Sequence, residues 1–130
     1  MKKLLIASTN KGKIKEVRAQ LKDFDFEIIG LDNFPELMNI EEDGDSFEEN
    51  ALKKARVSAQ KTNLITLADD SGLEVDYLDG KPGIYSARFS GENATDQENN
   101  KKLLKELKGI EKEKRTARFR CVMALYDPAN

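Results

Sequence analysis

The chain has 130 residues, with 22 lysines and arginines against 24 aspartates and glutamates, one cysteine and no histidine. This length is enough for one domain with a buried core, the net charge of −2 gives no bulk attraction to nucleic acid or anionic lipid, and no apolar run is long enough to span a membrane. Without histidine, a Ser-His-Asp triad, a Cys-His dyad and an imidazole zinc site are excluded, so acid–base chemistry must use carboxylates, lysines, tyrosines or metal-bound water.

The first elements are a strand and a helix. A continuous apolar run predicts a short buried strand over residues 3–8, ended by Ser-Thr-Asn. Apolar residues then recur at i, i+3 and i+7, which predicts an amphipathic helix that either Thr9 or Asn10 can cap. The residues of this apolar face are Ile14, Val17 and Leu21.

A second strand and a second helix follow. Residues 24–31 read as a strand, and a loop then leads into an acidic segment at residues 41–45. Ser46 with Glu49 three positions later forms a capping box, which predicts a helix that runs to about residue 62. Its expected buried face, at steps of four, comprises Phe47, Ala51, Ala55 and Ala59.

The rest of the chain adds strands and one more helix. Residues 64–68 predict a short strand that runs into Asp69-Asp70-Ser71-Gly72, and alternation over residues 73–78 predicts a second strand. A capping box at Thr95 predicts a helix that ends near residue 109, and residues 115–126 predict a long strand in which Cys121 packs as a small apolar residue. The whole pattern indicates one α/β domain over residues 1–130.

The polar turn at residues 8–13 reads Ser-Thr-Asn-Lys-Gly-Lys. A strand that feeds a helix through such a turn gathers backbone N–H groups at the electropositive helix end, which suits a phosphate group. Lys11 and Lys13 add positive charge, although the spacing of a P-loop is absent. An ordinary capped helix start with surface lysines is the alternative.

The acidic segment, Glu-Glu-Asp-Gly-Asp at residues 41–45, has carboxylates that can bind a hard cation. It does not fit an EF-hand, because placing Gly44 at the sixth loop position puts Asn50 at the twelfth, where a bidentate glutamate is needed. The alternative is a solvated acidic loop that the dipole of the following helix favours.

Two adjacent acids, Asp69 and Asp70, directly follow an apolar strand. One of them must lie near the buried strand end, where a charge is costly unless it meets a cation or a metal. Strand ends are also where α/β folds bind ligands. A plain Asp-Ser-Gly turn that continues through Ser71 is the alternative.

Two further positions carry positive charge. Lys54 and its basic neighbours lie within the second predicted helix, where they can reach a phosphate or pair with glutamates one turn away. Arg88, in the Pro-Gly-Ile-Tyr-Ser-Ala-Arg-Phe segment at residues 82–89, can clamp a phosphate or a carboxylate. An aromatic packing corner is the alternative for that segment.

Five motifs in order are more specific than any one of them. On these motifs the chain resembles the inosine/xanthosine triphosphate pyrophosphatases, enzymes that remove non-standard purine nucleotides, from Lys3 to about Tyr126. The motifs are STNKGKIKE at 8–16, SFEENALKKAR at 46–56, ADDSGLEVD at 68–76, PGIYSARFSG at 82–91 and ATDQENN at 94–100.

The resemblance implies a fold and an activity. The fold is an elongated mixed α/β structure, in which a twisted mixed sheet with flanking helices forms two lobes beside a nucleotide cleft. The activity is Mg²⁺-dependent hydrolysis of ITP, dITP and XTP to the monophosphate and pyrophosphate, by a cytoplasmic homodimer. The expected partner is therefore a purine nucleoside triphosphate, with neither nucleic acid nor membrane.

The resemblance also implies roles for single residues. Asp70 is the implied general base for the attacking water, and Glu41 and Asp70 are the implied Mg²⁺ ligands, although Glu42 is adjacent to Glu41 and can exchange roles with it. Lys13 and Lys54 are implied to hold phosphate oxygens. The full set of implied substrate-binding residues is Ser8, Thr9, Asn10, Lys11, Gly12, Lys13, Lys54 and Ser71.

Members of the family continue further, with a Gly-Phe-Gly-Tyr-Asp-Pro motif and a Ser-His-Arg motif that hold the purine base. We therefore expect residues 1–130 to be roughly the N-terminal two-thirds of such a domain, with an exposed sheet edge and with weak or no turnover. Two alternatives stay open. One is non-catalytic binding of triphosphate or pyrophosphate, and the other is a related pyrophosphatase for other modified nucleotides.

Overall fold

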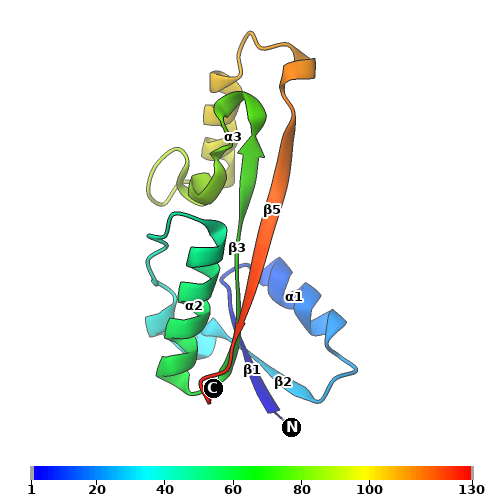
Figure 1. Ribbon diagram of the computed structural model, residues 1–130, viewed down its shortest axis with the longest axis vertical. Coiled ribbons are helices and arrows are strands. Elements are labelled where there is room, and N and C mark those ends of the chain that lie inside the picture. The colour runs from blue at the N-terminus through cyan, green and yellow to red at the C-terminus, as the bar shows by residue number, and fades with distance from the viewer. Residues whose placement is uncertain (1, 130) are drawn as a thin grey trace. The chain divides into compact units, whose positions relative to one another are not determined.

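The computed structural model describes residues 2–129, which form the expected mixed α/β fold (Figure 1). The chain divides into two compact units, one made of the residues up to Asp70 together with those from Val122 onward, and the other of Ser71–Cys121. The helices are α1 (Lys11–Gln20), α2 (Phe47–Thr62) and α3 (Asp96–Glu106). The strands are β1 (Lys2–Ala7), β2 (Phe26–Gly30), β3 (Ile65–Val75), β4 (Lys81–Pro82) and β5 (Ala117–Tyr126).

The sheet of the first unit is parallel, with β1 between β2 and β3. Leu4 of β1 lies opposite Ile28 of β2 and Ile65 of β3, and the pairing with β3 ends where Ala7 lies opposite Ala68. Beyond that point β3 pairs with β4 in the antiparallel direction, and β5 also pairs with β3. This mixed sheet confirms the predicted fold class.

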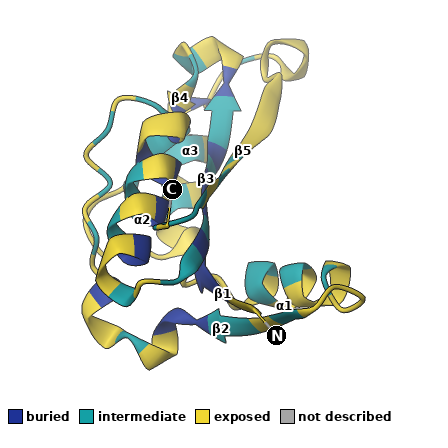
Figure 2. Cartoon of the chain, turned by 60° about the horizontal axis from the view of Figure 1, so that its bottom comes forward, coloured by how far each residue is buried: buried dark blue, intermediate teal, exposed yellow. Residues whose placement is uncertain are grey.

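Helices α1 and α2 cover opposite faces of the parallel sheet (Figure 1). The predicted face of α2 is confirmed, because Phe47 is buried and Ala51, Ala55 and Ala59 have no exposed surface. Such small side chains let the helix approach the sheet closely. Helix α1 covers its face more loosely, since it buries no residue completely (Figure 2). The core cluster comprises Leu5, Ala7, Leu31, Leu37, Ala55 and Ala68.

Of the two predicted capping boxes, the one at Thr95 is complete and the one at Ser46 forms only in part. The Oγ atom of Ser46 accepts the N–H of Glu49 at 3.1 Å, but the Glu49 carboxylate accepts the N–H of Asp45 at 2.7 Å rather than that of Ser46. At the start of α3 both halves of the capping box form, because Thr95 and Glu98 each accept the other's N–H, at 3.1 and 2.9 Å.

The prediction of two separate strands around Asp69–Asp70–Ser71–Gly72 is wrong, and so is the alternative of a plain turn there, because β3 runs without interruption from Ile65 to Val75. The alternative of a turn rested on residue types that favour turns locally. In the structure these residues remain extended, and Asp69 and Asp70 are buried, with 7% and 6% of their surface exposed. Tertiary packing therefore overrides the local preference, and the two predicted strands are one.

The final strand is confirmed, but the predicted packing of Cys121 is wrong, because its side chain is exposed. The row of alternate residues that includes Phe119, Met123 and Leu125 is also exposed, at 82%, 54% and 65%. Apolar alternation normally marks a buried face. Among residues 2–129, no other element covers this row. Within the same residues β5 pairs with β3 alone, so its other edge is exposed, as we expected from the sequence.

The second unit holds α3 against the segment Gly83–Arg88 and the residues after it. The Nδ2 atom of Asn99 donates to the carbonyl of Ala87 at 3.1 Å, and Lys102 donates to that of Phe89 at 2.8 Å, with its ammonium over the Phe89 ring. Arg88 lies over the Tyr85 ring, 5.0 Å from its centroid, and the Tyr85 side chain is itself exposed. No helix within residues 2–129 has both the length and the apolar character to cross a bilayer.

Candidate functional site

The turn between β1 and α1 is organised by Asn10, which is the N-cap of α1. Its Oδ1 atom accepts the N–H groups of Gly12 at 2.9 Å and Lys13 at 3.2 Å, and its own N–H donates to Ser8 Oγ at 3.1 Å. The cap therefore uses two of the N–H groups that would otherwise bind a phosphate. This agrees with the alternative interpretation of the turn as an ordinary capped helix start. The capacity for an anion then rests on the lysine and hydroxyl side chains of the turn.

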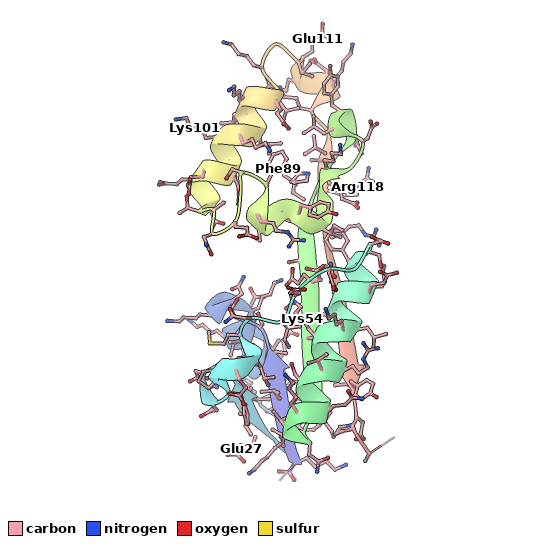
Figure 3. All side chains as sticks on the ribbon, turned by 90° about the vertical axis from the view of Figure 1, so that its left-hand side faces the viewer. Glu27, Lys54, Phe89, Lys101, Glu111 and Arg118 are labelled. Carbon is pink, nitrogen blue, oxygen red and sulfur yellow. The ribbon has the colours of Figure 1, made fainter. Side chains whose placement is uncertain are left out.

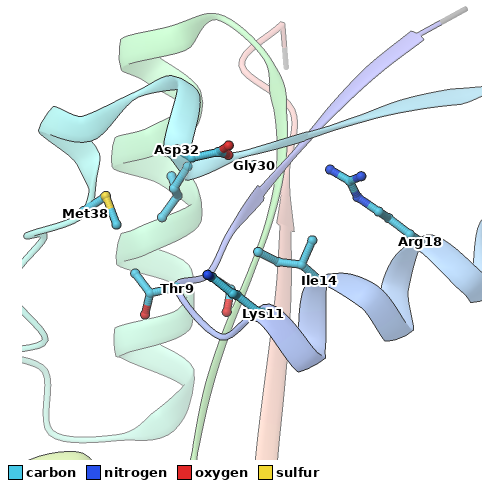
Figure 4. Close-up of a pocket in the computed structure, with 9 residues that line it drawn as sticks. Thr9, Lys11, Ile14, Arg18, Gly30, Asp32 and Met38 are labelled. Carbon is cyan, nitrogen blue, oxygen red and sulfur yellow. The ribbon is translucent and has the colours of Figure 1, made fainter.

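A pocket of about 360 Å³ opens beside this turn, at the carboxyl ends of β1 and β2 (Figure 4). Lys11 and Arg18 bring positive charge to its wall, and Asp32 brings one negative charge. Three of the residues implied to bind substrate share this pocket. Its lining residues are Ser8, Thr9, Lys11, Ile14, Arg18, Gly30, Leu31, Asp32 and Met38.

Arg18 and Asp32 line this pocket, but they were not among the site residues predicted from the sequence, although the sequence held a signal for each. Arg18 lies seven residues after Lys11, two helical turns along the same face. Asp32 follows the carboxyl end of a parallel strand, which is where ligands of such sheets bind.

The two adjacent acids of β3 lie on opposite faces of the sheet, because successive side chains of a strand alternate. Asp69 lies on the α1 face, where its carboxylate forms an ion pair with the Nζ atom of Lys13. Asp70 shares the other face with Ala68, which packs with Ala55 of α2. Since β1 pairs with β3 only as far as Ala68, both acids lie just beyond the carboxyl end of β1.

The charge of Asp69 therefore meets a cation, as its burial requires. The Asp69 side chain is 10% exposed and that of Lys13 is 30% exposed, so the pair is largely shielded from water. The implied roles left Asp69 without a function, and the structure makes it the partner of an implied phosphate ligand. Ser71, two residues after Asp69, is half-buried in β3 and is the first residue of the second unit.

The acidic segment lies along the first turns of α2. Lys54, labelled on α2 in Figure 3, donates to the Glu42 carboxylate at 3.0 Å, and Lys53 donates to Asp43 at 2.7 Å. The hydrogen bond and the charge of Lys53 hold the pKa of Asp43 below its ordinary value of 3.8. Lys53 and Lys54 are thus each paired with a carboxylate of the acidic segment.

This pairing separates Glu41 from Glu42. Glu42 is half-buried and engaged by Lys54, whereas Glu41 is exposed and, among residues 2–129, has no hydrogen bond or ion pair. Of the two candidates that the sequence left open, Glu41 is therefore the carboxylate that a cation can reach without displacing a lysine.

The donor chemistry of Glu41 and Asp70 fits a magnesium ion. Both are hard carboxylate oxygen donors, and Mg²⁺ is usually held by one or two carboxylates together with substrate phosphates and water. Within the described chain no three acidic, cysteine or histidine side chains converge on one point, so a cage made only of protein ligands is not formed. The ion would be shared with the substrate.

Comparison with known proteins agrees with these features. The profile of the Ham1 family matches residues 4–130. A dITP/XTP pyrophosphatase of Geobacter sulfurreducens is 57% identical over 128 residues, which make up 98% of this chain and 64% of that protein. The chain thus spans slightly less than two-thirds of the length of the first curated relatives it matches.

Solved structures give the same result at the level of the fold. The Ham1 protein of Staphylococcus aureus has a TM-score of 0.85 and 42% identity, over 99% of this chain and 65% of that one. The nucleoside-triphosphatase / dITP/XTP pyrophosphatase of Mycobacterium abscessus has a TM-score of 0.83 and 42% identity, over 98% and 66%. The resemblance seen in the motifs is confirmed, and the chain belongs to the Ham1 family.

Proposed function

We propose that the protein is a nucleoside triphosphate pyrophosphatase that hydrolyses dITP, ITP and XTP to the monophosphate and pyrophosphate. The observation that carries the proposal is the position of Asp70, a buried carboxylate just past the carboxyl end of β1, where the lysine-containing turn also begins. Relatives more than half identical in sequence are named dITP/XTP pyrophosphatases, which favours this substrate class.

In the proposed reaction, Asp70 takes the proton of a water whose oxygen attacks the α-phosphorus. The bond from that phosphorus to the bridging oxygen breaks, and pyrophosphate leaves. Lys11 and Lys13 would bind phosphate oxygens from the turn, and Lys54 would do so from α2, where their charges stabilise the leaving group. This chemistry needs a carboxylate base and cations, so the absence of histidine from the chain is no obstacle.

Glu41 and Asp70 would hold Mg²⁺ together with the phosphates. When bound, the ion supplies charge neutralisation and a lower pKa for the attacking water. Before any substrate binds, Lys13 is held by Asp69 and Lys54 by Glu42, so the two implied phosphate ligands are already oriented by acidic neighbours. A preset orientation reduces the entropy that is lost on binding.

Asp70→Asn tests the proposal in the intact protein. We expect the kcat for pyrophosphate release from dITP to fall by about 10²–10⁴, the contribution typical of a general base, with little change in the urea midpoint of unfolding. Glu36→Gln, which neutralises an exposed acid outside the site, is the matched control. A panel of dITP, XTP, dATP and dGTP measures selectivity, and an unchanged rate in Asp70→Asn would remove Asp70 as the base.

The homodimer and the cytoplasmic location are further proposals that rest on the resemblance. Sedimentation velocity measures the first, and fractionation of cells measures the second. Calorimetry with pyrophosphate addresses the alternative of a non-catalytic protein, which predicts binding of pyrophosphate without turnover of any nucleotide on the panel.

A further inference from the structure

Four consecutive residues of the acidic segment are tied to α2 in reverse order along the helix. We call this set of contacts the loop–helix clamp. Its pairs are Glu42 with Lys54, Asp43 with Lys53, Gly44 with Asn50 and Asp45 with Glu49. Each successive residue of the loop contacts a residue closer to the start of α2 than the one before it. The segment is therefore held against the helix along its whole length.

Asn50 makes the buried contact of the clamp. The residue has no exposed surface, and its Oδ1 atom accepts the N–H of Gly44 at 2.8 Å. Because the Gly44 partner is a donor, the amide must present its oxygen to the loop. Its Nδ2 atom is buried and, within residues 2–129, has no hydrogen-bond partner. An apolar residue would avoid that cost, so the distinctive contribution of Asn50 is the acceptor for Gly44.

The loop approaches Asn50 so closely that Gly44 has no space for a side chain. A Cβ atom at position 44 would lie 2.7 Å from Asn50 Oδ1 and 2.8 Å from the Cβ of Glu49. The ion pair of Asp43 with Lys53 is weaker as a tether, because the Asp43 side chain is 62% exposed and exposed pairs contribute little. The bond between Gly44 and Asn50 is the contact with which water competes least.

We propose that Asn50 is a positioning residue for cation binding. Through Gly44 it fixes the backbone of the acidic segment and so places Glu41, whose exposed side chain has no contact of its own to hold it. The inference rests on the proposed function, in which Glu41 is a ligand of the divalent cation. It adds a residue that never touches the ion and yet sets the affinity for it.

The test is a titration of the intact protein with Mn²⁺ alone, in which the free ion is measured by electron paramagnetic resonance. We expect Asn50→Leu to weaken Mn²⁺ binding about tenfold, as the loss of an outer contact to a metal ligand typically does. Hydrogen exchange at the Gly44 amide should accelerate, while the unfolding midpoint stays equal or rises. A purely structural role predicts the opposite split, with a lower midpoint and unchanged Mn²⁺ affinity.

Three further variants test the contact between Gly44 and Asn50. Asn50→Asp keeps an oxygen acceptor for Gly44 and should restore both the slow exchange and the Mn²⁺ affinity. Ser58→Ala is the matched control, because Ser58 is also fully buried on α2 with an unpartnered hydroxyl within the described chain, but is not part of the clamp. Gly44→Ala attacks the same contact from the loop and should weaken Mn²⁺ binding even if Asn50→Leu does not fold.

The outcomes separate the inference from the function on which it rests. Mn²⁺ affinity that stays within about twofold of the parent in Asn50→Leu or Gly44→Ala, while Glu41→Gln weakens it about tenfold, overturns the role of Asn50 alone. Unchanged affinity in Glu41→Gln removes Glu41 as a ligand, and the inference fails together with that assignment.

Discussion

The ion pair between Lys13 and Asp69 gives a prediction in which the loss of stability depends on which partner is removed. The pair joins α1 to β3, and within the described chain Lys13 is the cation that reaches Asp69. Lys13→Met leaves a carboxylate whose side chain is only 10% exposed, whereas Asp69→Asn leaves an ammonium on a side chain that is 30% exposed.

The magnitudes follow from these exposures. Removing one partner from a fully buried pair costs about 3–5 kcal/mol, and access of water to the Lys13 side reduces this to about 2 kcal/mol for Lys13→Met. Asp69→Asn should cost about 1 kcal/mol or less, because the flexible lysine stem can turn its ammonium toward solvent. Since the double variant has no stranded carboxylate, it should be about 1 kcal/mol more stable than Lys13→Met.

Urea unfolding of the four proteins in the cycle measures these differences from the midpoint, provided that the slope is unchanged. Lys15→Met, which removes an exposed lysine from the same helix, should stay within about 0.5 kcal/mol of the parent. If Asp69→Asn lowers the stability of the Lys13→Met protein as much as it lowers that of the parent, the two side chains act independently and the reasoning is refuted.

Three other predictions concern single contacts. NMR titration should place the pKa of Asp43 below 3.8, and Lys53→Met should return it toward that value; the stabilisation is present above pH 3.8 and is lost as the pH falls through the lowered pKa. Ala55→Leu should lower the free energy of unfolding by about 1–3 kcal/mol, measured in urea, because the residue is fully buried against the sheet. Thr95→Ala should cost about 1 kcal/mol through loss of the side-chain cap of α3. The pKa of Glu98 is lowered mainly by the backbone N–H of residue 95, which alanine keeps, and secondly by the Thr95 hydroxyl, so in the same titration it should rise only part of the way toward 4.5.

The elements that the sequence predicted well are those governed by local chemistry. The start of α1 at Asn10, the start of α2 at Ser46 and the box at Thr95 each depend on residues within one helical turn. The buried face of α2 follows from helical period alone. Asn50 lies three residues after Phe47 on that face, so a polar residue on an apolar stripe was the available signal for it.

The elements that it predicted wrongly depend on partners distant in the chain. Asp69, Asp70, Ser71 and Gly72 have the composition of a turn, and they stay extended because β3 has pairing partners and Lys13 meets one of the charges. The burial of Cys121 was inferred from alternation, which shows that one side of a strand is apolar but not whether anything covers it.

The choice between Glu41 and Glu42 also depends on a partner that is distant in the chain. Two adjacent glutamates are equivalent in composition, and nothing in their spacing selects one of them. The structure distinguishes them because Gly44 binds Asn50, which brings Glu42 level with Lys54 on the helix. A lysine two turns into α2 thus gives two neighbouring glutamates different surroundings.

The adjacent acids of β3 are distinguished by the same kind of argument. Alternation along the strand turns Asp69 toward α1 and Asp70 toward α2, so neighbours of identical chemistry have different surroundings. Asp69 is neutralised by Lys13 and orients it, and Asp70, on the other face, is the base in the proposed reaction. In the proposed reaction this division gives one carboxylate to the positioning of a phosphate ligand and the other to the water. The dipeptide supports both tasks only because it lies within a continuous strand, since in a turn the two side chains would not be held on opposite faces.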